Sequence, residues 1–272
     1  MLVVILLAGC SRKKDKFLNK NFHSLTTKYN FLFNGNNLYA EGLSDLENDI
    51  RENFWNLIPI EKFKYYDLDD EERETNFTRS EEKATLAIQK HSMNVDGKER
   101  NPIMDQAYFL LGKSRYYDNR FIPALEAFNY ILYKYPTSEY INKVKIWKEK
   151  INIRLDQNKY AIDNLKELLE EENLLTEEKS IANSYIAQAF INIEEIDSAT
   201  HYLKKSNQQH KNITNNLRKT FLLAQLYQDL SISDTAYTLY SEIIDLHRKI
   251  PRELYINSFI KRSMVTDSID AE

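Results

Sequence analysis

Glycine, proline and cysteine are all scarce in this chain. Its 272 residues include five Gly, five Pro and one Cys, whereas glycine and proline together average about 12% of a sequence. Collagen-like sequences, Gly/Ser linkers and most turn-rich β folds are therefore excluded. The single Cys excludes an intrachain disulfide and a Cys-based zinc site.

An excess of one charge is also missing. Thirty-seven Lys and Arg against 41 Asp and Glu give a formal net charge of −4, which is too balanced for a nucleic-acid binder. So few glycines cannot build a phosphate-binding loop. The five His have no metal-ligand spacing, and no Gly-x-Ser-x-Gly motif occurs. The sequence predicts no enzyme activity, no cofactor, no metal site and no small-molecule substrate.

The single Cys is Cys10. It follows an apolar run at residues 2–7 and the small residues Ala8 and Gly9. This pattern resembles a bacterial lipobox, which implies a signal peptide at 1–9, cleavage before Cys10, and several acyl chains on Cys10. More than one chain is needed for stable anchoring. The alternative is a short buried apolar segment with an inert Cys. Because the run is short and no basic residue precedes it, we expect the true start to lie upstream of Met1.

Residues 10–20 are predicted to form a lipidated tether. Arg12, Lys13, Lys14 and Lys16 make it polar and basic, which suits a connection between lipid and folded protein. The neutral Ser11 after the Cys resembles the pattern of lipoproteins sorted to the outer membrane. We therefore expect a chain anchored in the outer membrane and facing the periplasm.

A repeat is visible between residues 105 and 250. Gly112, Ala124, Phe128 and Pro136 match the small, small, aromatic and Pro positions of the 34-residue tetratricopeptide (TPR) helix–turn–helix, and Tyr108 matches its first large position. Small residues allow two helices to approach closely, and large ones fill the space around the contact.

The same step of 12 residues between small side chains recurs further along. It separates Ala187 from Ala199 and Ala224 from Ala236, and a weaker unit runs from Trp147 to Leu169. We therefore predict four TPR-like units of about 34 residues at 105–250. The predicted fold class is all-α, a TPR right-handed superhelical solenoid of antiparallel helix pairs.

The chain before and after the repeats is also predicted to be helical. Residues 21–104 are expected to form a helical N-terminal region with an acidic insertion. Its expected elements are helices at 27–33, at 39–50 with its end at 55–59, and at 80–90 with Ser80 as N-cap, the insertion at 67–74, and a loop at 94–102. Residues 251–272 are expected to be an unpaired helix and an open C-terminal end, so that the chain resembles a fragment.

Motifs outside the repeats resemble one family. Residues 22–30, the triplet Phe33-Asn34-Gly35 and residues 53–61 are similar to the head of the SprE/PorW TPR lipoproteins of Bacteroidetes, and residues 82–84, 87–93, 115–117 and 120–128 extend the match. The resemblance covers Cys10 to Phe259. It implies a non-enzymatic role in the type IX secretion system and in gliding motility, with protein partners from that machinery. Members of the family are much longer than this chain.

Two other functions are kept beside this one. A TPR lipoprotein of the outer-membrane β-barrel assembly machinery resembles residues 124–140, although such proteins begin their repeats near the anchor. A solenoid arm of a cell-wall hydrolase would need a catalytic domain, and no residues here supply one.

In a TPR superhelix the first helix of each pair lines the concave face. The candidate protein-binding residues there are Gln106, Phe109, Lys113, Tyr116, Tyr117, Ser184, Gln188, Asn192, Arg218, Phe221, Gln225, Gln228 and Asp229. Aromatic and amide side chains suit an extended peptide or a partner helix. They do not match the Lys/Asn clamp that binds a C-terminal carboxylate. For Phe109 and Phe221, packing between neighbouring repeats is an equal alternative.

Three tripeptides, which begin at Asp197, Asp234 and Asp267, resemble the Asp-Ser/Thr-apolar O-glycosylation motif of Bacteroidetes. For the first two there is another explanation, in which the Asp caps the second helix of a repeat.

Overall fold

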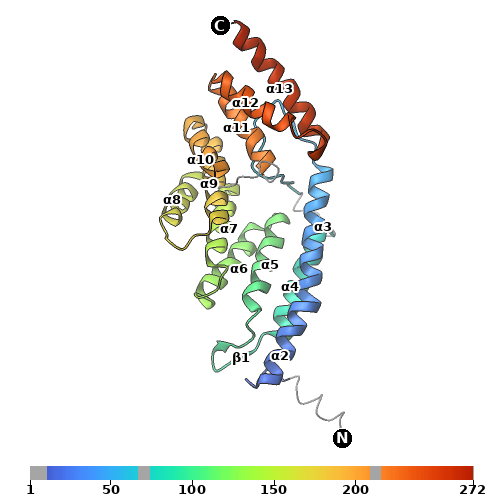
Figure 1. The fold of residues 1–272 in the computed structure, drawn as a ribbon. Helices are drawn as coiled ribbons and strands as arrows, with labels where there is room; N and C mark the ends of the chain where they lie inside the picture. The colour runs from blue at the N-terminus through green and yellow to red at the C-terminus, as the bar shows by residue number, and fades with distance from the viewer. Residues whose placement is uncertain (1–10, 67–73, 209–215, 272) are drawn as a thin grey trace. The chain divides into compact units, whose positions relative to one another are not determined.

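The computed structural model describes residues 11–66, 74–208 and 216–271, with the side chains of the last helix described to residue 266. Apart from one hairpin of two-residue strands, β1 (Asn94–Val95) and β2 (Lys98–Glu99), the regular structure of these residues is helical (Figure 1). The predicted all-α class is confirmed. Cys10 and most of the acidic insertion lie outside the described residues.

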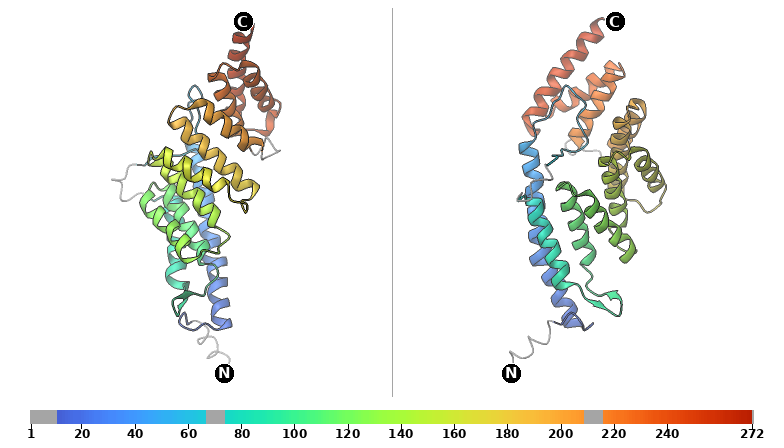
Figure 2. Two further views of the ribbon diagram at one scale, coloured as in Figure 1. Left: turned by 90° about the vertical axis from the view of Figure 1, so that its left-hand side faces the viewer. Right: turned by 180° about the vertical axis from the view of Figure 1, so that it is seen from behind.

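The chain forms two compact units. Unit 1 comprises residues 1–50 and 63–151, and unit 2 comprises 51–62 and 152–272. The helices of unit 1 are α2 (Phe17–Thr26), the π-helix η1 (Thr27–Leu32), α3 (Phe33–Asp49), α4 (Asn76–His91), α5 (Met104–Tyr117), α6 (Phe121–Lys134) and α7 (Ile141–Arg154), which crosses the boundary. Those of unit 2 are α8 (Asn158–Leu169), α9 (Thr176–Asn192), α10 (Ile196–Gln208), α11 (Leu217–Asp229), α12 (Ser233–Ile244), the 3₁₀ turn η3 (His247–Lys249) and α13 (Arg252–Ala271). Figure 2 shows the antiparallel pairs α9/α10 and α11/α12 from two further sides.

Four inter-helix turns share one backbone conformation. Asn119, Asp156, Glu194 and Ser231, which follow α5, α7, α9 and α11, all have φ between 58° and 64°. In each turn the next N–H donates to the carbonyl five residues earlier, at 2.8 to 2.9 Å, which is the Schellman arrangement. The turns recur at intervals of 37, 38 and 37 residues. Helix pairs joined by these turns thus follow one another along the chain. Their period is longer than the predicted 34 residues, because the links between pairs, such as 135–140 and 170–175, lengthen each repeat.

Gly112 lies where α5 meets α6 in the first pair. A Cβ at this position would lie 2.5 Å from Cε1 of Phe128, and both Phe128 and Ala124 are completely buried. The close contact of a small with a large residue is the one that the repeat pattern predicts. The packing of α5 on α6 therefore requires a residue without a Cβ at position 112.

We expect Gly112→Ala to lower the free energy of unfolding by about 1–3 kcal/mol, because the added methyl group overpacks the contact with Phe128. Chemical denaturation measures this change. Combining it with Phe128→Leu, which removes the ring, should recover part of the loss. Equal and additive effects of the two substitutions would contradict the predicted contact.

The N-terminal region differs from its prediction, because α2, η1 and α3 form one uninterrupted helical stretch at 17–49. The prediction of two separate helices at 27–33 and 39–50 is therefore wrong. The turn-like residues between them are absorbed into the helix: Asn34 and Asn36 donate to the carbonyls of Asn30 and Leu32 at 2.6 and 2.8 Å. Gly35 lies against α4 and α5, where a Cβ would come within 2.8 Å of Leu110.

The predicted Ser80 cap is also wrong. Helix α4 begins at Asn76, and Thr75 is its N-cap, with the Thr78 N–H donating to Thr75 Oγ1 at 3.1 Å. Ser80 is completely buried within the helix. Its hydroxyl donates to the Gly35 carbonyl at 2.8 Å and accepts from Ser114 at 2.9 Å. A buried serine that joins three helices carries the same sequence signal as an exposed cap.

The second helices of the repeats start earlier than predicted. Helix α10 begins at Ile196 and α12 at Ser233, so that Asp197 and Asp234 lie in the first turn and are not caps. Their carboxylates still favour the helix through its dipole. The helix expected after Pro251 is present as α13, and it packs against α12 with Leu254 and Val265 buried.

Two buried histidines join α2 to α4. His23 and His91 face each other with their Nδ1 atoms 2.9 Å apart, so one ring must be an acceptor and the two cannot both be protonated in this geometry. Burial, and then the charges of His23, Arg12 and Lys90, lower the pKa of His91 from 6.5 to about 4. The native structure therefore favours neutral His91.

This pKa shift predicts that acid destabilises unit 1. Between pH 6.5 and about 4 the unfolded chain binds more protons at His91 than the native one, so the free energy of unfolding falls as the pH drops through this window. Above pH 7 the contribution is constant. Denaturant titrations at pH 7.5 and 5.5, chosen at about one pH unit on each side of 6.5, should show a smaller difference for His91→Gln than for the wild type. An equal difference would refute the shift.

Candidate functional site

Residues 51–62, which we call the strap, form neither helix nor strand and lie along α9 and α11 in unit 2. The sequence predicted a helix end at 55–59, and this is wrong. The strap contacts four of the candidate protein-binding residues, namely Gln188, Arg218, Phe221 and Gln225. The face predicted to hold a peptide therefore holds an extended segment of the same chain.

The amide of Gln225 on α11 is the central polar contact. Its oxygen accepts from the Ile58 N–H at 3.1 Å, and its nitrogen donates to the carbonyls of Asn56 at 2.7 Å and Phe54 at 3.3 Å. On α9, the oxygen of Gln188 accepts from the Ile60 N–H at 2.8 Å. These bonds satisfy backbone groups, so they recognise an extended chain and not a particular side chain.

Arg218 adds a charged contact at the start of α11. Its two terminal nitrogens donate to the carboxylate of Glu52, and its Nε donates to the Pro59 carbonyl at 2.7 Å. A fork of this kind is bidentate and geometrically specific. One arginine thus holds the strap at two positions seven residues apart, Glu52 and Pro59.

Apolar side chains complete the strap contact. Phe54 meets Phe221 edge to face with ring centroids 5.4 Å apart, and Phe221 meets Tyr240 in the same way. Phe221 is completely buried, and Ile58 is only 2% exposed. For Phe221, packing is therefore the observed role, and its partner includes the strap.

The other candidate residues of unit 2 do not contact the strap in the same way. Ser184 is buried and bonds Ser206 at 2.7 Å. Asn192 is exposed and bonds Gln188 and Asn158, both at 2.9 Å. Gln228 accepts from the Tyr240 hydroxyl at 3.1 Å, and Asp229 is exposed at the end of α11.

The candidate residues of unit 1 also face chain and not open space. Phe109 and Tyr117 are less than 10% exposed and Tyr116 is completely buried. Phe109 packs on Trp147 and Tyr140, so packing is its observed role, and Tyr117 stacks on Phe77 at 5.0 Å. Gln106 is half-buried.

Lys113 extends from α5 into this aromatic group. Its ammonium lies 4.2 Å from the ring centroid of Tyr39 and 5.1 Å from that of Phe109, which are cation–π distances. Burial, and then the nearby charges of Lys150 and Lys143, lower the pKa of Lys113 to about 8. This lysine is enclosed by rings and is not presented to a carboxylate ligand.

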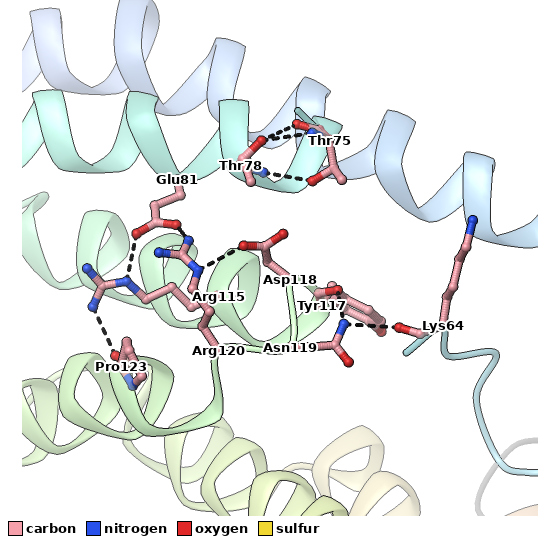
Figure 3. Close-up of polar contacts among 10 residues, drawn as sticks. All are labelled: Lys64, Thr75, Thr78, Glu81, Arg115, Tyr117, Asp118, Asn119, Arg120 and Pro123. Atoms are coloured by element: carbon pink, nitrogen blue, oxygen red, sulfur yellow. Dashed lines mark hydrogen bonds and ion pairs between the residues drawn. The ribbon is translucent and has the colours of Figure 1, made fainter. Parts of the chain in front are cut away.

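Figure 3 shows the polar contacts where α5 turns into α6. Glu81 accepts from Arg115 at 2.8 Å and from Arg120, and Arg120 Nε donates to Asp118 at 2.8 Å. Asn119, the positive-φ residue of this turn, donates to the Lys64 carbonyl at 3.0 Å. The residues just after the strap are thereby held in unit 1. The ring centroids of Phe63 and Tyr116 lie 5.3 Å apart.

One cluster in unit 2 has the residue types of a serine–lysine dyad. Lys219 donates to the hydroxyls of Ser180 and Ser206 at 3.0 Å each, and burial lowers the pKa of Lys219 to about 8. Both serines are completely buried, so no substrate reaches their oxygens. The cluster joins α9, α10 and α11 and is structural.

The described residues contain no group of three or more His, Cys, Asp or Glu side chains arranged to hold a metal ion. Within the same part of the chain, no helix combines the length and the apolarity needed to cross a membrane.

No protein-family model matches this sequence, and none of the curated proteins is significantly similar to it. Among solved structures, the TPR2AB domain of yeast Sti1 in its pHSP90 complex is similar, with 12% sequence identity, a TM-score of 0.33, and coverage of 84% of this chain and 96% of that one. Similarity at this level carries no argument about a ligand. The TPR-like assignment rests on the helix pairs and their repeated turns.

Replacing Gln225 with Ala should loosen the strap, because three backbone groups lose their partner at once. We expect hydrogen exchange to rise at least tenfold at 51–62, with cleavage by protease in the same segment. Gln228→Ala is the matched control, since it removes the same side chain one turn later on α11 and leaves the strap bonds intact. Equal exchange in the two variants would refute the role assigned to Gln225.

Proposed function

We propose that this protein is a lipid-anchored, non-enzymatic scaffold that binds protein partners in the type IX secretion and gliding apparatus, at the periplasmic face of the outer membrane. The observation that carries the proposal is the position of the motifs outside the repeats. Phe54, Ile58 and Pro59 lie in the strap, and Gly35 lies where a Cβ would come within 2.8 Å of Leu110 on α5. The residues that resemble the SprE/PorW head thus make the contacts that a generic TPR array does not need.

A protein-interaction role agrees with the fold. Stacked helix pairs present extended surfaces on which protein partners bind. In unit 2 the strap already occupies the face of α9 and α11, so a partner that uses this face must compete with residues 51–62. The chemistry of the strap indicates what such a partner would resemble, namely an extended chain with a carboxylate for Arg218 and an aromatic ring for Phe221.

The experiment that tests the assignment is affinity purification of the tagged protein from its host after mild cross-linking. Recovery of secretion-channel and motility proteins supports it. Recovery of β-barrel assembly subunits instead would contradict the assignment. It would favour the alternative function, a TPR lipoprotein of the β-barrel assembly machinery, whose sequence pattern residues 124–140 resemble. Gene neighbourhood supplies an independent check on the same choice.

The anchor has its own prediction. Cys10→Ala should abolish incorporation of a labelled fatty acid and move the protein out of the outer-membrane fraction, because several acyl chains are needed for stable attachment. Ser11→Ala, one residue away, should change neither. Labelled fatty acid on the Cys10→Ala protein would refute the anchor and leave the partner experiment unaffected.

A further inference from the structure

The first helical stretch of unit 1 exposes an unusual amount of apolar side chain. Leu18 is 68% exposed, Leu25 56%, Tyr29 59% and Phe33 58%, and Phe22 is 44% exposed. Steps of four, three, four and four residues separate these positions, and such steps keep side chains on one face of a helix. We call these five residues the apolar stripe.

The stripe faces away from the rest of unit 1. Asn19, His23, Thr27 and Leu32 of the same stretch are buried, and they form the side that contacts α4 and the 94–102 loop. His23 meets His91, and Thr27 accepts from Asn101 at 3.1 Å. With its inner side fixed by these contacts, the helix cannot rotate to bury the stripe.

Positive charge surrounds the same stretch. Residues 11–40 contain six Lys or Arg and one acidic residue, Asp15, in a chain whose net charge is −4. Asp15 pairs with Arg100 at 3.2 Å. The exposed cations of the stretch are Arg12, Lys13, Lys14, Lys16, Lys20 and Lys28. The Lys28 ammonium lies 5.3 Å from the Tyr29 ring, beside the stripe.

Apolar side chains on one helix face and lysines around them fit one kind of surface best. An interfacial helix buries its apolar face at the level of the lipid headgroups, and its cations attract anionic lipids. The ring of Tyr29 is of a kind enriched at that depth, and Phe and Leu are typical of the apolar face of such helices. An apolar groove on a partner protein would accommodate the stripe but would supply no anionic groups for the surrounding lysines.

We propose that the apolar stripe docks on the surface of a membrane that contains anionic phospholipid, with the surrounding lysines at the headgroups. The helix would then lie along the membrane and orient unit 1 on it. The inference rests on residues 12–33 and not on a lipid at Cys10, so failure of the anchor and failure of this surface are separate results.

The test uses a chain that starts at Ser11, which keeps every residue that the structure describes and has no lipidation site. Its sedimentation is measured with vesicles of phosphatidylcholine containing about one-third phosphatidylglycerol, an anionic surface that attracts such basic segments. We expect binding that falls when salt is raised and is at least tenfold weaker with pure phosphatidylcholine vesicles, because the lysines contribute through charge.

Leu18→Asp combined with Leu25→Asp should reduce binding at least tenfold and leave the helical circular dichroism unchanged, since both side chains point to solvent. Tyr133→Asp is the control, because Tyr133 on α6 is 84% exposed but lies outside the stripe. Unchanged binding of the double variant, or no binding of the parent chain, would overturn the proposal. A parent chain that dimerises in sedimentation, with a monomeric double variant and no vesicle binding, would assign the stripe to self-association instead.

Discussion

The contact between the Gln225 amide and the strap organises unit 2. One side chain satisfies backbone groups of Phe54, Asn56 and Ile58, and Arg218 attaches Glu52 and Pro59 beside it. Phe54 and Ile58 are buried, and their backbone groups would otherwise be left unpaired, at a cost of about 1–3 kcal/mol each. The Gln225 amide and the Arg218 guanidinium supply the backbone hydrogen bonds that a neighbouring strand would otherwise make with the strap.

The strap also makes unit 2 discontinuous in sequence. The chain leaves unit 1 after residue 50, contributes residues 51–62 to unit 2, and returns to unit 1 at residue 63. Glu52 and Arg218 are 166 positions apart. Closing so long a loop costs chain entropy, which the contacts of the strap offset. Unit 2 is complete only when residues from the N-terminal part of the chain are present.

The repeats explain how so few glycines and prolines suffice. Glycine is needed at Gly112, where Phe128 leaves no room for a Cβ. The four inter-helix turns adopt positive φ with Asn, Asp, Glu and Ser instead, although a non-glycine residue in this region costs roughly 1–2 kcal/mol. The Schellman bonds and the packing of the following helix hold these turns in place. The period of the array is set by the links between helix pairs, which the small-residue pattern does not report.

Local patterns in the sequence determined the helical class, because helix periodicity depends on residues within one or two turns of each other. The spacing of small and large residues also located the contact of Gly112 with Phe128. The loop expected at 94–102 instead contains the hairpin of β1 and β2. Four of the residues that these patterns predict for a binding face, Gln188, Arg218, Phe221 and Gln225, contact an extended segment of the same chain. Only the tertiary structure decided which segment that is. Local patterns predict a helix end at 55–59 and a cap at Ser80, because the partners that decide these positions, Gln225 and Gly35, lie 167 and 45 positions away. No local periodicity encodes contacts over such distances, and packing alone brings them together.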